Sequence, residues 1–307
     1  MKKVLVATVK PFAPAAVKQI QTIIEDAGYE FVLLEKYADQ SDFINAVADV
    51  DALIIRSDKA TAEVINTAKN LKIIIRAGAG YDNIDLAAAT EKNVVAMNTP
   101  GQNSNAVAEL ALGMMVYLAR NQFNGTAGKE LRGKNLGMHA YGHVGKLVGE
   151  IAKGFGMKLY AYDPYISKEI IENDGVEYVD DIKDLYSKCD YVSLHIPAND
   201  ETKGSINYDL ISLMPENATL VNTARKEVIN ETDLIKAFEN IKGFKYISDI
   251  APDCNAEISE KFPGRFFFTP KKSGAQTSEA NINAGVAAAN QIRDFFEKGD
   301  TKFQVNK

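Results

Sequence analysis

A glycine-containing turn between an apolar run and a helical pattern is the clearest candidate for chemistry in this chain. Residues 140–145 read Ala-Tyr-Gly-His-Val-Gly and follow the apolar run Leu136–Ala140. Gly142 would let a pyrophosphate approach the backbone, and Gly145 would let the following helix pack closely on the strand. The N-terminus of that helix offers free N–H groups and a positive dipole. The spacing therefore predicts a site for the diphosphate of a dinucleotide.

Asp163 is the second part of the predicted dinucleotide site. It ends the run Lys158–Tyr162, at the spacing expected for a carboxylate that binds ribose hydroxyls. A carboxylate repels a 2′-phosphate, and no arginine lies nearby to bind one, so we expect NAD rather than NADP. The fingerprint is incomplete because Ala140 stands where its first glycine belongs. A tight strand-to-helix turn without a ligand is the alternative.

The elements that would position this site follow from an alternation of short apolar runs with amphipathic stretches such as Pro14–Ala27 and Ser41–Ala48. Such an alternation is typical of parallel α/β architecture, here two Rossmann-like doubly wound sheets. One long helix is predicted over 107–118 and another over 282–296 from apolar residues at helical spacing. The predicted strands are Val4–Thr8, Phe31–Leu34, Ala52–Arg56, Ile73–Ala77 and Val94–Met97, then Leu136–Ala140, Lys158–Tyr162, Tyr191–His195, Thr219–Asn222 and Tyr246–Ile250.

Size and charge exclude several classes of protein. A chain of 307 residues can bury two cores. Its net charge of −6 argues against a general binder of nucleic acid or of anionic membranes. The two cysteines, Cys189 and Cys254, imply no disulfide framework, and the longest apolar stretch is too short to span a bilayer. We therefore expect a cytoplasmic enzyme.

Several separate segments resemble the D-isomer-specific 2-hydroxyacid dehydrogenase family, in the family's order and over nearly the whole chain. They are Arg76–Asp85, Asn98–Pro100, Ala108-Glu109, Asp190–Pro197 and Val221–Arg225. Within the family, the chain is most similar to short D-3-phosphoglycerate dehydrogenases, which lack a regulatory C-terminal domain. The resemblance implies NAD-dependent oxidation of D-3-phosphoglycerate to 3-phosphohydroxypyruvate, the first step of serine biosynthesis, without serine feedback.

The resemblance also implies a homodimer whose cofactor domain is inserted into its substrate domain. We place the substrate-binding domain at residues 1–99 plus 286–307 and the NAD-binding domain at 100–285. The implied cofactor-binding residues are Gly142, His143, Val144, Gly145, Asp163, His195, Thr223, Ala224, Asp249 and Ala79. The implied substrate-binding residues are Arg56, Ser57, Lys59, Ala77, Gly78 and Arg225. No metal, nucleic acid or membrane is expected as a partner.

Oxidation of a 2-hydroxy acid needs a cation for the carboxylate and a base for the hydroxyl proton. Arg225 matches the family's catalytic arginine, and its planar fork can grip a carboxylate and reach the C2 oxygen. The alternative is an ordinary surface arginine. Asp249 matches an aspartate that lies beside the nicotinamide carboxamide in the family, and a simple helix N-cap is its alternative.

The predicted acid/base departs from the family pattern. Relatives usually carry Pro-His-x-Gly-Ala where this chain reads Pro-Lys-Lys-Ser-Gly-Ala over residues 270–275. Alignment on Gly274-Ala275 puts Lys272 in the histidine column, and alignment on Pro270 puts Lys271 there. The column of the partner glutamate holds Cys254. A lysine has no tautomer to fix and needs no such glutamate, so we predict Lys272 as the acid/base and Cys254 as a packing residue.

Alternatives stay open for the base, the phosphate and the substrate. Lys272 would only bind the phosphate or carboxylate if water moved the proton. Arg56, Ser57 and Lys59 follow a strand and would bind the phosphate, although Lys59 fits a solvated loop as well. Glycerate, lactate or hydroxyisocaproate are other substrates, and a hydroxypyruvate or glyoxylate reductase is a related activity. A non-catalytic NAD(H)-binding sensor or corepressor is the alternative of a different class.

Overall fold

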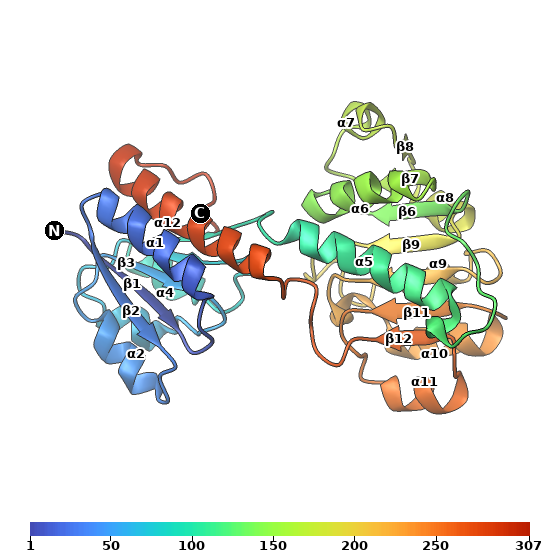
Figure 1. Cartoon of the computed structure of the whole chain (residues 1–307), viewed down its shortest axis with the longest axis horizontal. Helices are drawn as coiled ribbons and strands as arrows, with labels where there is room; N and C mark the ends of the chain where they lie inside the picture. The colour runs from blue at the N-terminus through green and yellow to red at the C-terminus, as the bar shows by residue number, and fades with distance from the viewer. The chain divides into compact units, whose positions relative to one another are not determined.

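The structure is a computed structural model that describes every residue from Met1 to Lys307. The chain divides into two compact units, each drawn in Figure 1. Unit 1 comprises Met1–Asn103 and Thr277–Lys307, and unit 2 comprises Ser104–Gln276. Unit 2 is therefore continuous in sequence, whereas unit 1 is made from two segments.

Unit 1 is a five-stranded parallel sheet in the order β2-β1-β3-β4-β5. Along β1, Val4 and Val6 face α1 and α12, whereas Leu5 and Ala7 face the other helices, because successive side chains of a strand alternate. Both faces are thus covered by apolar helix surfaces. The strands are β1 (Lys3–Thr8), β2 (Glu30–Glu35), β3 (Ala52–Ile55), β4 (Ile73–Arg76) and β5 (Val95–Asn98). Helices α1 (Pro14–Asp26) and α12 (Ser278–Lys298) cover one face, and α2 (Gln40–Val47), α3 (Ala62–Thr67) and α4 (Leu86–Glu91) cover the other.

Unit 2 is a seven-stranded parallel sheet in the order β12-β11-β10-β9-β6-β7-β8. Its strands are β6 (Asn135–His139), β7 (Lys158–Tyr162), β8 (Glu177–Tyr178), β9 (Tyr191–Leu194), β10 (Thr219–Asn222), β11 (Lys245–Ser248) and β12 (Phe266–Phe268). Helices α5 (Ser104–Ala119), α6 (His143–Gly154) and α7 (Lys168–Asn173) pack on one face. Helices α8 (Ile182–Lys188), α9 (Tyr208–Ile211), α10 (Glu231–Asn240) and α11 (Asn255–Lys261) pack on the other. Two short 3-10 turns, η1 (Asn121–Phe123) and η2 (Lys226–Val228), complete the unit.

The prediction of two parallel α/β sheets is confirmed, and each predicted strand is present within one or two residues of its expected bounds. The sequence analysis missed β8 and β12, which are two and three residues long. Residues 100–103 and 277–285, which we had placed in the cofactor domain, lie in unit 1. Residues 277–285 lie in unit 1 because α12 is one unbroken helix that packs on α1. No helix of the chain is both long enough and apolar enough to cross a membrane.

Candidate active site

The predicted site residues of unit 2 converge on the carboxyl edge of its sheet. The turn 140–145 follows β6, Asp163 follows β7 and His195 follows β9. Thr223 follows β10 and Asp249 follows β11. Strand order reverses between β6 and β9, so the loops after these two strands run to opposite faces of the sheet. Open α/β sheets bind their ligands at this kind of switch point.

The turn after β6 has the geometry expected of a dinucleotide turn. Gly142 is the N-cap residue of α6 and is exposed, with open space where a Cβ would stand. Gly145 lies so close to the strand end that a Cβ would come within 2.4 Å of the Ala140 carbonyl oxygen. Ala140 itself has a φ of +79°, in the left-handed region that favours glycine. The backbone therefore keeps a glycine-type turn although its first glycine is missing.

The carboxylate of Asp163 is buried and already organises the backbone around it. Its Oδ2 accepts the N–H of Tyr141 at 2.7 Å, and its Oδ1 accepts the N–H groups of Tyr165 and Ile166 at 2.8 and 3.2 Å. These bonds tie the end of β7 to the dinucleotide turn. Because a carboxylate oxygen has two lone pairs, Oδ2 can still accept one further donor.

In the loops that follow β9 and β10, two buried polar atoms lack any hydrogen-bond partner. They are Nε2 of His195 and Oγ1 of Thr223. Burial lowers the pKa of His195 to about 3, with a smaller contribution from His139, so the imidazole is neutral. Burial likewise lowers the pKa of His139 to about 4. Buried polar groups without partners are uncommon in proteins, and a ligand bound at these loops could supply the missing partners.

Arg225 and Lys272 are brought together by one carbonyl oxygen. Arg225 Nη1 donates to Ala224 O at 3.0 Å, and Lys272 Nζ donates to the same oxygen at 3.2 Å. The Asn222 amide closes the turn that carries Arg225, since its Nδ2 donates to Arg225 O and its Oδ1 accepts from Ala224 N. Two residues 47 positions apart in sequence thus present two cationic groups at one point. Lys271 has no side-chain contact of this kind.

Asp249 holds the loop that carries Lys272. The side chain is 2% exposed and accepts three hydrogen bonds from residues 269–274. Its Oδ1 accepts from Ser273 N at 2.7 Å, and its Oδ2 accepts from Gly274 N at 2.7 Å. A Cβ at Gly274 would lie 2.7 Å from Oδ2, which explains the need for glycine there. Asp249 is not the N-cap of α11, because that position is Cys254.

Cys254 is half-buried and lies against Glu231 rather than beside a base. The backbone N–H of Cys254 donates to Glu231 Oε2 at 2.8 Å. Burial first, and then the Glu231 carboxylate, raise the pKa of the thiol to about 12. The thiol therefore stays protonated at neutral pH, and we find no basis for a nucleophilic role.

In unit 1, Arg56 is engaged in internal contacts. Its guanidinium donates to the carbonyl oxygens of Lys10 and Pro11 at 2.9 and 2.8 Å and to the side chain of Asn281, and it lies over the Phe12 ring. The side chain thus ties the loop after β1 to α12. Ser57 and Lys59 are exposed, and the Lys59 ammonium has no partner in unit 1. These loops follow β1 and β3, where the strand order of unit 1 reverses.

The backbone N–H groups of Ala77 and Gly78 also donate hydrogen bonds within unit 1. Ala77 N donates to Ile55 O, and Gly78 N donates to Thr99 Oγ1 at 2.7 Å. The N–H groups of Ala79 and Gly80 have no acceptor in the unit. The guanidinium of Arg76 lies against Gly78. The resemblance implied roles for Ala77, Gly78 and Ala79 but did not show which backbone N–H groups are available.

Known proteins resemble this chain in sequence and in structure. The NAD-binding domain model of the D-isomer-specific 2-hydroxyacid dehydrogenases matches residues 105–261. The chain is 38% identical over 268 residues to a D-3-phosphoglycerate dehydrogenase of Methanocaldococcus jannaschii, which covers 83% of this chain and 51% of that relative. It is 36% identical over 284 residues to a hydroxypyruvate reductase of Thermotoga maritima, which covers 86% of this chain and 90% of that relative.

The structural similarity extends over the whole chain. A solved structure of NAD+-bound 3-phosphoglycerate dehydrogenase from Entamoeba histolytica is 49% identical, with a TM-score of 0.89 over 100% of this chain and 99% of that one. By contrast, the chain spans about half the length of the curated D-3-phosphoglycerate dehydrogenases from M. jannaschii and Synechocystis.

Proposed function

Because this chain belongs to the D-isomer-specific 2-hydroxyacid dehydrogenase family, we propose that it oxidises D-3-phosphoglycerate to 3-phosphohydroxypyruvate with NAD, as in serine biosynthesis. The observation that carries the proposal is the pair of cations, Arg225 and Lys272, that share the Ala224 carbonyl oxygen. They lie in the unit that also contains the dinucleotide turn. Both cysteines are free, which agrees with the reducing cytoplasm where we place the enzyme.

The residues at the carboxyl edge of unit 2 fit NAD. The N-terminus of α6 and the open face of Gly142 would receive the pyrophosphate. Asp163 Oδ2 has acceptor capacity left for a ribose hydroxyl, and the unpartnered His195 Nε2 and Thr223 Oγ1 would gain partners from the cofactor. His143, Val144 and Ala224 border the same turns. When bound, NAD supplies the acceptor for the hydrogen on C2 of the substrate.

The reaction can be assigned to this chain's own residues. Arg225 would hold the substrate carboxylate and stabilise charge on the C2 oxygen as the C–H bond breaks. Lys272 would accept the proton of the C2 hydroxyl on Nζ, so that oxygen keeps the electron pair of the O–H bond and forms the carbonyl. Arg225 and Lys272 donate to the same carbonyl oxygen, so both groups can reach one bound substrate. Asp249 remains our candidate for contact with the nicotinamide carboxamide, and its loop contacts add a positioning role.

Lys272 rather than Lys271 is the better candidate because of its contact with Ala224. The family's histidine needs a glutamate to fix its tautomer, whereas a lysine has no tautomer to fix. Cys254, which occupies the column of that glutamate, stays protonated beside Glu231. The loss of the histidine and the loss of its glutamate are therefore chemically consistent with each other.

We propose Lys59 as the main phosphate ligand, ahead of Arg56 and Ser57. Arg56 already donates hydrogen bonds to carbonyl oxygens of its own unit. Lys59→Ala should raise KM for D-3-phosphoglycerate about tenfold and change KM for D-glycerate by less than about twofold, since only the first substrate has a phosphate. Initial-rate assays with the two substrates would measure both constants.

Lys69→Ala is the matched control for Lys59, because Lys69 is exposed at the amino edge of the same sheet, before β4. It should leave both KM values unchanged. Equal increases for the two substrates in Lys59→Ala would remove Lys59 from the phosphate site.

The second candidate is reduction of an unphosphorylated 2-oxo acid such as hydroxypyruvate. Two observations favour it. The guanidinium of Arg56 is hydrogen-bonded within its own unit, and the chain is similar to a hydroxypyruvate reductase over 90% of that relative. Absorbance at 340 nm with NAD and a panel of D-2-hydroxy acids, and with NADH and the matching oxo acids, decides between them. A higher kcat/KM for D-3-phosphoglycerate than for D-glycerate supports the first proposal. No turnover with any acid would favour an NAD(H)-binding sensor.

We also propose that the chain forms a homodimer through α5 and η1. Along the outer face of α5, the residues between Glu109 and Arg120 are uncharged, and Gly113 is exposed with open space over it. Phe123 on η1 is 65% exposed. A surface helix normally turns polar side chains outward, so this apolar face suits a second copy.

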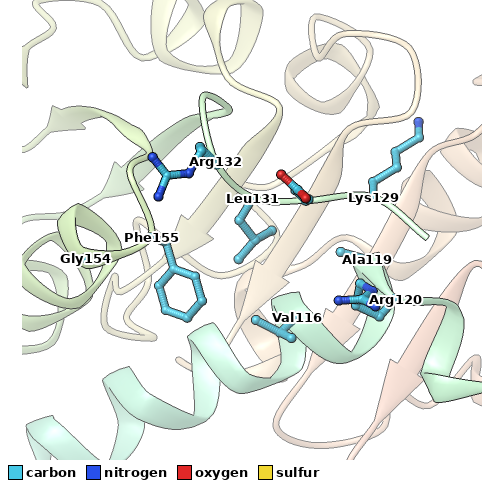
Figure 2. A pocket seen from close by; sticks show the side chains of 9 residues that line it. Val116, Ala119, Arg120, Lys129, Leu131, Arg132, Gly154 and Phe155 are labelled. Carbon is cyan, nitrogen blue, oxygen red and sulfur yellow. The ribbon is translucent and has the colours of Figure 1, made fainter. Parts of the chain in front are cut away.

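A recess beside this face adds to the case for the dimer. It has a volume of about 360 Å³ and lies between the end of α5, the segment before β6 and the end of α6. Figure 2 shows Val116, Leu131 and Phe155 in its wall, with the basic side chains Arg120, Lys129 and Arg132 around it. We infer that the second copy fills it, because the apolar wall continues the outer face of α5.

Phe123→Glu should convert the dimer to a monomer, because it places a charge on an apolar contact that two-fold symmetry repeats. Sedimentation velocity measures the mass directly. Ile170→Glu on α7, which also replaces an exposed apolar residue of unit 2, should remain dimeric. A wild-type monomer, or a dimer that survives Phe123→Glu, would contradict this interface.

A further inference from the structure

The dinucleotide turn begins with a backbone conformation that its residue disfavours. Ala140 has a φ of +79°, which glycine adopts readily and an L residue with a Cβ does not. The turn has little room to relax, because α6 begins against it and a Cβ at Gly145 would lie 2.4 Å from Ala140 O. The surrounding structure must therefore hold Ala140 in this conformation.

Tyr141, the next residue, is fixed at both ends. Its N–H donates to Asp163 Oδ2 at 2.7 Å, and its hydroxyl lies 3.2 Å from Asp174 Oδ2. The side chain is 2% exposed and its ring lies under α6. A Cβ at Gly149 would lie 3.7 Å from the ring and from the hydroxyl, which places this turn of α6 directly against the tyrosine. The backbone and the side chain of one residue thus anchor the turn to two different carboxylates.

Asp174 is itself held in place by α6. Its Oδ2 pairs with Lys146 Nζ at 3.0 Å, and its carbonyl oxygen accepts from Lys153 Nζ. Lys146 is also the largest cause that lowers the pKa of Asp174, so the group is ionised. Burial and then Asp174 raise the pKa of Tyr141, which therefore remains a hydroxyl donor. The bond between them is a charge-assisted one, which is stronger than a bond between neutral groups.

We propose that the Tyr141 hydroxyl, held by Asp174, is a positioning group that keeps residues 140–145 in the conformation needed to receive the cofactor's pyrophosphate. The inference rests on the proposed function, in which NAD binds at this turn. The hydroxyl offsets the unfavourable backbone of Ala140, so that the binding-competent turn is the main state before the cofactor arrives. Loss of this bond would lower the competent fraction, and the apparent affinity falls by the same factor.

Tyr141→Phe tests this role because it removes one oxygen and keeps the ring. The dissociation constant of NADH, measured by fluorescence titration, should rise roughly fivefold to tenfold. The value of kcat at saturating NAD should change by less than about twofold, because the reacting groups are elsewhere in the unit. Tyr191→Phe is the matched control, since Tyr191 is buried in β9 and its hydroxyl makes no hydrogen bond. It should leave NADH binding unchanged.

The decisive variant is Ala140→Gly in the Tyr141→Phe background. A glycine adopts the left-handed conformation without assistance, so the double variant should bind NADH within about twofold of wild type. A Tyr141→Phe protein that binds NADH as wild type does, or a double variant that stays weak, would overturn the inference and leave the proposed function intact. If the wild-type chain bound no NADH, the result would contradict both the role of Tyr141 and the proposed function.

Discussion

Arg225→Lys is expected to lower kcat/KM for D-3-phosphoglycerate by about 10²–10³-fold, although it keeps the positive charge. In the structure Arg225 uses Nη1 for Ala224 O, which fixes the guanidinium plane and leaves its other N–H groups for a substrate. A carboxylate and a C2 oxygen can be held together by this planar fork but not by one ammonium group. The dissociation constant of NADH should stay within about twofold of wild type.

The control for Arg225 is Arg293→Lys on α12, an arginine that pairs only with its neighbour Asp294 in sequence. It should retain full activity. Steady-state kinetics that resolve KM and kcat separately also show which step Arg225 affects. A rise in KM at constant kcat would mean that Arg225 only binds the carboxylate, whereas a fall in kcat places it in the transition state. Near-normal kcat/KM in Arg225→Lys would remove Arg225 from the site.

The sequence predicted the dinucleotide edge because its signals are local. A strand, a glycine turn, a helix and a terminal Asp163 follow one another within 28 residues, and their spacing alone fixes which groups meet. The structure adds what spacing does not contain. Asp163 also binds three backbone N–H groups, and Ala140 keeps a left-handed φ without being glycine.

The contact between Lys272 and Ala224 could not be predicted, because it joins two loops through tertiary packing. Pro270 and Gly274 gave two alignments of the lysine pair, and the sequence contains no sign that Asp249 holds the loop that carries them. For Arg56, the residue type and the place after a strand predicted a phosphate ligand, and the structure adds contacts with Lys10, Pro11 and Asn281 that the sequence does not contain. The strand β12 was missed because three consecutive phenylalanines show no alternation.

Lys272→Arg should lower kcat for oxidation by about 10²–10⁴-fold, the usual contribution of a general base. The variant keeps a cation beside Ala224, but a guanidinium does not give up its proton near neutral pH. Binding of the substrate's negative groups should therefore persist, with KM within a few fold of wild type. Lys271→Arg is the matched control, because the two lysines are adjacent and exposed and only Lys272 contacts Ala224. It should keep near-normal kcat.

The pH profile identifies which group moves the proton. In the wild type, kcat for oxidation should rise with pH as Lys272 becomes neutral, because only the neutral amine can accept the hydroxyl proton. The group responsible should be Lys272, whose ammonium donates to the same carbonyl oxygen as Arg225. Lys272→Arg should lose the rising limb together with the rate. If the variant kept both, Lys272 would be a binding residue, and the proton would leave through water or another group.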